Sequence, residues 1–114
     1  MKLITNEQRV KLLDNGAAAA CGEGRDPRPV VKLFTPDANA TWLLTELDPA
    51  EPDRAFGLCD LGLGSPELGY VLVSELEALR GPLGLSVERD RYFVAHRPIS
   101  AYARDAQAAG AIRA

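Results

Sequence analysis

Four apolar segments with the composition of β-strands lie between Val30 and Val73 and constrain the fold more than any other feature. Short turn segments rich in proline, glycine, aspartate and asparagine separate them. Because a crossover connection between parallel strands needs a dozen or more residues, we expect neighbouring segments to pair antiparallel as a meander. The predicted strands are Val30–Thr35, Thr41–Leu47, Ala55–Leu61 and Leu68–Val73.

A helix is predicted before this sheet, over Asn6–Asn15. Thr5 is its N-cap, Gln8 completes a capping box, and Gly16 suits the position that follows the last helical residue. The next segment, Ala17–Pro29, contains two glycines, two prolines and four charged residues. We expect it to be a flexible connector inside the domain and not a domain boundary.

Two more helices are predicted after the strands. Ser74 and Glu77 repeat the capping-box spacing before Glu75–Arg80, and Ile99–Ala109 shows the apolar spacing of one packed helix face. The segment Leu85–Val94 is expected to add one more strand or a hairpin arm. The sequence therefore predicts a single α+β domain over residues 1–114, an antiparallel β-meander of four to five strands covered on one side by short helices.

The net charge of −3 hides a segregated distribution. From Asp37 to Glu77 every charged residue is acidic except Arg54, whereas bases outnumber acids in the rest of the chain. An acidic surface repels phosphates, so direct nucleic-acid binding is disfavoured. The expected partner is a basic protein, from the host or from the same genetic element, or a nucleoprotein complex. The candidate binding residues are Glu46, Asp48, Glu51, Asp53, Asp60 and Glu67.

Asp60 has two interpretations, because it ends a predicted strand and precedes the glycine-rich segment Gly62–Gly69. Its carboxylate could accept amide hydrogens from that loop in an Asx turn, which is a structural role. It could instead lie beside Glu46 and share acid–base or ligand-binding work with it. The loop lacks the glycine spacing and the following helix of a dinucleotide-binding fingerprint, so no cofactor is expected.

Trp42 and Tyr70 are candidate interface aromatics, because aromatic side chains anchor many interfaces. Both lie in predicted strands, where burial in the core is the commoner role. Cys59 and His96 could form a nucleophile–base pair only if the fold brought them together, and nothing near Cys59 in the sequence would lower its pKa. No catalytic residue and no metal site are predicted.

The first residues show no secretory signal, and no apolar run is long enough to cross a bilayer. We therefore expect a cytoplasmic protein without membrane association. Its two cysteines, Cys21 and Cys59, are expected to be free thiols in that reducing compartment.

Three runs carry a resemblance to a known family: VVKLFTPDANATWLLTELDP, AFGLCDLGLGSPELGYVLVSELEAL and ERDRYF. They resemble a family of small bacterial proteins of uncharacterised function, found mostly on plasmids, integrated elements and phages and often near conjugation or antirestriction genes. The resemblance implies an accessory protein of a mobile genetic element. It brings no activity and no catalytic residue.

These observations together predict a non-enzymatic protein that inhibits a host defence system, of anti-CRISPR or antirestriction type, by presenting an acidic face to a basic partner. Two alternatives stay open. One is a small enzyme or ligand-binding domain that uses Asp60 and Glu46 near the glycine loop. The other is an accessory subunit for plasmid transfer or replication.

Overall fold

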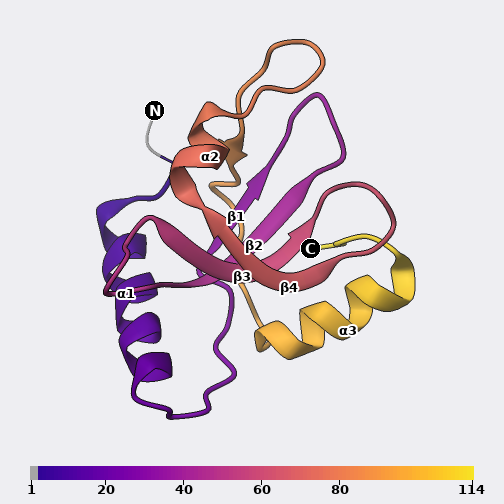
Figure 1. The fold of residues 1–114 in the computed structure, drawn as a ribbon. Coiled ribbons are helices and arrows are strands. Elements are labelled where there is room, and N and C mark those ends of the chain that lie inside the picture. The colour runs from indigo at the N-terminus through magenta and orange to yellow at the C-terminus, as the bar shows by residue number, and fades with distance from the viewer. Residues whose placement is uncertain (1–2) are drawn as a thin grey trace.

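A five-stranded antiparallel sheet with the strand order β4-β3-β2-β1-β5 forms the centre of the protein (Figure 1). The computed structural model describes residues 3–114. The strands are β1 (Val31–Phe34), β2 (Thr41–Leu47), β3 (Arg54–Asp60), β4 (Glu67–Leu72) and β5 (Glu88–Arg89). The helices are α1 (Asn6–Ala20), α2 (Val73–Ala78) and α3 (Ile99–Ala109). The predicted α+β class and the antiparallel meander are confirmed, because β1 to β4 pair in chain order.

Two hydrophobic clusters lie on opposite faces of the sheet. On one face Trp42 and Leu44 of β2 pack with Leu12 of α1. On the other face Leu43 packs with Leu58 of β3 and with the apolar side of α3. The prediction that helices cover only one side is therefore wrong. Successive side chains of a strand point to opposite faces, so the consecutive apolar residues of β2 need cover on both.

Helix α1 is longer than the predicted segment Asn6–Asn15. The capping box at its start is confirmed, since the Thr5 hydroxyl accepts from the Gln8 amide and the Gln8 side chain accepts from the Thr5 amide. Gly16 does not end the helix but lies inside it, where a Cβ atom would stand 1.8 Å from the Leu47 carbonyl oxygen. Glycine is needed here for close packing against β2, and the helix continues through Ala20.

The expected connector therefore begins after the helix, at Cys21. It passes beside the start of α3, where the Pro27 carbonyl accepts a 2.8 Å hydrogen bond from the Ile99 amide. The Asp26 carboxylate also accepts from the Ser100 amide at 3.1 Å. The flexibility of this segment stays a prediction.

The second predicted helix starts earlier than expected, because α2 follows directly on β4. Ser74 is not its N-cap but lies in its first turn, where its hydroxyl donates a 2.6 Å hydrogen bond to Asp53. Helix α3 has the predicted bounds, and Gly110 ends it in the left-handed conformation with φ 77°. None of the helices between residues 3 and 114 is long and apolar enough to span a membrane.

Candidate functional site

Four of the six predicted binding residues gather where β2 turns into β3. We call Glu46, Asp48, Glu51 and Asp53 the acidic corner. A tight turn joins Asp48 to Glu51, since the Glu51 amide donates to the Asp48 carbonyl at 3.2 Å and the Asp48 carboxylate accepts from the Ala50 amide at 2.9 Å. Glu46 lies just before this turn, in β2. Asp53 accepts from the amide and the hydroxyl of Ser74, which fixes its carboxylate at the start of α2.

Arg54 is the only base among these acids, and it is shared between two partners. Its guanidinium lies 3.8 Å from an oxygen of Asp48 and 3.8 Å from the centre of the Tyr70 ring. Burial and the nearby charge of Asp48 raise the pKa of Glu46 above its ordinary value. Because the corner has four acidic residues and Arg54 is the one base among them, it has more acidic groups than Arg54 can neutralise.

A small hollow of about 190 Å³ lies between the acidic corner and the end of α1. Its walls include Glu46, Asp48, Phe56 and Tyr70, with the two aromatic rings in an edge-to-face contact at 5.0 Å between their centres. This volume is below the 300–1,000 Å³ or so of a typical small-molecule pocket. Arg54 also lines the hollow, where its guanidinium is stacked on the Tyr70 ring.

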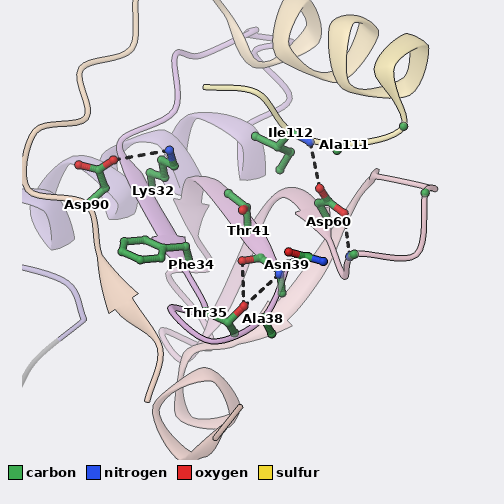
Figure 2. Close-up of a pocket in the computed structure, with 14 residues that line it drawn as sticks. Lys32, Phe34, Thr35, Ala38, Asn39, Thr41, Asp60, Asp90, Ala111 and Ile112 are labelled. Atoms are coloured by element: carbon green, nitrogen blue, oxygen red, sulfur yellow. Dashed lines mark hydrogen bonds and ion pairs between the residues drawn. The ribbon is translucent and has the colours of Figure 1, made fainter. Parts of the chain in front are cut away.

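Asp60 lies in a second region, beside a pocket of about 550 Å³ (Figure 2). One of its carboxylate oxygens accepts from the Gly62 amide at 2.8 Å, and the other accepts from the Ile112 amide at 2.9 Å. The Asx-turn interpretation is confirmed by the first of these bonds. Both oxygens of this buried carboxylate serve to hold backbone in place.

The walls of this pocket come mainly from β1, the loop between β1 and β2, the loop between β3 and β4, and the C-terminal segment. Figure 2 shows Lys32, Phe34 and Thr41 around it, with the Lys32 amine 3.5 Å from the Asp90 carboxylate. The volume lies within the usual range for small ligands. Neither Lys32 nor Phe34 was predicted as a site residue, although they are the positions of β1 that alternate with buried Val31 and Leu33.

The structure does not bring Glu46 and Asp60 together. Asp60 stands opposite Thr41 at one end of β2, whereas Glu46 stands opposite Phe56 near the other end. Glu67, opposite Cys59, is also at the Asp60 end. The six predicted binding residues are thus divided into the acidic corner and a separate pair, and no paired-carboxylate centre forms.

Comparison with known proteins identifies the family. The family model described as "Protein of unknown function (DUF2958)" matches residues 3–113. The chain belongs to the DUF2958 family. No match was found among curated proteins or among solved structures. The resemblance to an uncharacterised family is thereby confirmed, and its plasmid and phage association stays a prediction.

The two candidate aromatics of this DUF2958 protein have opposite environments. Trp42 is 2% exposed in the first cluster, so its role as an interface candidate is wrong and its expected core role is confirmed. Tyr70 is 62% exposed, so its expected burial is wrong. Tyr70 lies on β4, which is at the edge of the sheet.

Cys59 and His96 do not form a pair in the DUF2958 protein. Cys59 packs against the first cluster, and its burial raises the pKa of the thiol. The backbone amide of His96 donates to the Tyr102 hydroxyl, and Tyr102 belongs to the second cluster, on the opposite face of the sheet. Within residues 3–114, no group of three or more histidine, cysteine or acidic side chains could hold a metal ion.

Proposed function

We propose that the protein is a non-enzymatic binding protein whose acidic corner docks against a basic surface of a partner protein. The main observation behind this proposal is that Arg54 interacts with both Asp48 of the acidic corner and Tyr70. The Arg54 guanidinium lies near one carboxylate, that of Asp48, and is also stacked on Tyr70, so the four acids of the acidic corner outnumber the one base among them. Burial, and after it the repulsion from the charge of Asp48, raises the pKa of Glu46. Cations supplied by a partner would relieve that repulsion and steer its approach.

The proposed partner is a protein of a host restriction or CRISPR system. Such proteins hold nucleic-acid phosphates in basic clefts, and carboxylates can take the place of those phosphates. The predicted association of this family with mobile elements supports this partner class. A protein for plasmid transfer or replication would fit the same charge pattern and is the alternative outcome of the test.

The test is affinity capture from bacterial lysate at low and high salt, with the bound proteins identified by mass spectrometry. The bait is the wild-type protein or the corner variant E46Q/D48N/E51Q, which leaves Asp53 in place because it holds the start of α2. We expect wild type to capture a basic defence protein at low salt, and the corner variant to lose it.

The matched control is the variant E7Q/D14N/E88Q, which removes the same charge from exposed positions elsewhere. It should capture the same protein as wild type. Equal capture by the corner variant would refute the proposal, and so would equal loss by both variants. If wild type and the control variant capture a transfer or replication protein and the corner variant does not, the proposed binding function stands. The partner is then a transfer or replication protein and not a defence protein.

The pocket beside Asp60 supports a second candidate function, the binding of a small polar ligand. Its size fits such a ligand, and the Lys32 amine and the Thr41 hydroxyl lie on its walls. Screening small carboxylates and phosphates by thermal shift should find one that raises the Tm of wild type but not of Lys32→Met. A screen without such a compound would remove this candidate.

A further inference from the structure

The two edges of the sheet are not equivalent. One edge is β5, which has two residues, whereas the other is β4, which has six. No strand of residues 3–114 pairs with the outer side of β4. Proteins usually protect an exposed edge strand from pairing with other chains by short length, bulges, proline or charge. Strand β4 has a continuous register with β3 and no charged residue after Glu67.

Hydrogen bonds fix which backbone groups of β4 point outward. The Val73 amide donates to the Asp53 carbonyl at 2.8 Å, so Val73 faces β3. Residues of an antiparallel pair alternate between facing the partner strand and facing away. Leu68 and Tyr70 therefore direct their N–H and C=O groups to the free edge, and Leu72 directs its N–H there. Leu72 is also the N-cap of α2, so its carbonyl accepts the first hydrogen bond of that helix.

A second contact leads to the same assignment. The Asp48 amide donates to the Arg54 carbonyl at 3.0 Å, so Arg54 faces β2. By alternation Ala55 and Gly57 face β4. Their register partners, Val71 and Gly69, therefore face β3, which leaves the even-numbered positions of β4 for the free edge.

The same three residues expose apolar side chains. Leu68 is 43%, Tyr70 is 62% and Leu72 is 38% exposed. Between them, a Cβ atom on Gly69 would meet nothing within 4 Å. Open hydrogen-bonding groups and apolar side chains on alternate positions are the two requirements for adding a further strand to a sheet.

The charged residues near the two ends of β4 indicate what kind of strand could pair with it. Glu67 stands at the start of β4, and the acidic corner stands beyond its other end, with Asp53 bound to Ser74 just after the strand. A second copy pairing antiparallel would set each Glu67 beside the other copy's acidic corner, which is repulsive. An extended segment rich in lysine or arginine meets opposite charge at both ends.

We propose that β4 binds an extended basic segment of the partner protein as a sixth strand, through the backbone of Leu68, Tyr70 and Leu72. The segment would belong to the protein that the acidic corner attracts, so this role of the edge rests on the proposed function. Charge brings the segment to the sheet, and strand pairing fixes its direction and register.

The probe is a fluorescein-labelled peptide as long as β4, blocked at both ends, in which arginine alternates with valine. Its binding is measured by fluorescence anisotropy at low salt. Leu68→Pro removes one outward N–H without touching the hydrogen bonds to β3, and Leu68→Ala removes the same side chain but keeps that N–H. We expect Leu68→Pro to bind the peptide at least about tenfold more weakly than Leu68→Ala.

Two further measurements do not depend on the folding of the proline variant. A peptide of equal charge with N-methyl groups on alternate residues should bind wild type at least about tenfold more weakly than the unmodified peptide. The unmodified peptide should also slow hydrogen exchange at the amides of Leu68, Tyr70 and Leu72. Equal binding of both peptides, unchanged exchange at these amides, or no peptide binding would overturn the edge proposal.

The corner variant E46Q/D48N/E51Q separates this proposal from the proposed function. If it loses the peptide while N-methylation and Leu68→Pro have no effect, charge alone binds the peptide and only the edge role fails. If N-methylation weakens binding while the corner variant binds as wild type does, strand pairing stands and the function proposed for the acidic corner fails.

Discussion

The amide of Ile112 donates a 2.9 Å hydrogen bond to the carboxylate of Asp60, 52 positions earlier in the chain. The other carboxylate oxygen accepts from Gly62, so one buried side chain fastens both the glycine loop and the C-terminal segment to the end of β3. Asp60 is part of the wall of the pocket in Figure 2, and it fixes the position of two other parts of that wall, Gly62 and Ile112.

Replacing Asp60 with alanine should destabilise the protein. Each hydrogen bond to a charged group contributes about 1.5–3 kcal/mol, and Asp60→Ala leaves two amides without their acceptor, so we expect a loss of at least about 2 kcal/mol. Chemical denaturation measures it. Asp60→Asn keeps one carbonyl acceptor and should fall between wild type and Asp60→Ala. An Asp60→Ala protein as stable as wild type would show that these bonds are dispensable.

Gly57 and Gly69 face each other across β3 and β4 but tolerate a methyl group differently. A Cβ atom on Gly57 would lie 2.1 Å from the Leu43 carbonyl oxygen, whereas one on Gly69 would meet open space. Overpacking costs about 1–3 kcal/mol, so Gly57→Ala should lower the free energy of unfolding by that amount. Gly69→Ala should change it by less than about 0.5 kcal/mol. Similar losses for the two variants would contradict this packing.

Glu46→Gln should stabilise the protein at neutral pH. Burial and the charge of Asp48 raise the folded-state pKa of Glu46, so the charged carboxylate destabilises the fold above that pKa. The penalty is relieved as the pH falls through the raised pKa. The Tm of Glu46→Gln should therefore exceed that of wild type at about pH 7 and match it below about pH 4. The control is Glu67→Gln, which removes an exposed carboxylate and should give no such gain. If the Tm gain of Glu46→Gln persists in acid, the charge of Glu46 is not its cause.

The two cysteines should differ in reactivity. Cys21 is exposed after α1, whereas Cys59 is half-buried and burial raises its pKa, which disfavours the reactive thiolate. Iodoacetamide should modify Cys21 at least about tenfold faster than Cys59 in the folded protein, as followed by peptide mass spectrometry. The rates should converge in denaturant. Equal rates in the folded protein would mean that Cys59 is far more accessible than the structure shows.

Features set by local sequence could be predicted. The turn residues and the apolar periodicity located β2 and α3 at their observed bounds, and the Asx turn of Asp60 needs only Gly62, two residues away. Gly16 could not be interpreted locally. Its neighbours indicate a helix end, and the reason for glycine is the approach of Leu47, which is distant in the sequence.

The sequence pattern also does not show where each strand lies in the sheet. The alternation of β4 does not say that the strand lies at an edge, so the exposure of Tyr70 and its contact with Arg54 were not predicted. The consecutive apolar residues Trp42, Leu43 and Leu44 did contain a signal for cover on both faces. The division of the acidic residues between two ends of the sheet follows from strand register, which composition does not contain.

The most direct measurement of the central claim is the salt dependence of the affinity between the captured partner and the protein. Titration calorimetry would compare wild type, E46Q/D48N/E51Q and E7Q/D14N/E88Q over a series of salt concentrations. Because exposed charges are screened by salt, wild type and the control variant should both lose affinity steeply as salt rises, whereas the corner variant should bind weakly with a shallow dependence. Three variants with the same affinity and the same salt dependence would contradict the claim that the acidic corner binds the partner.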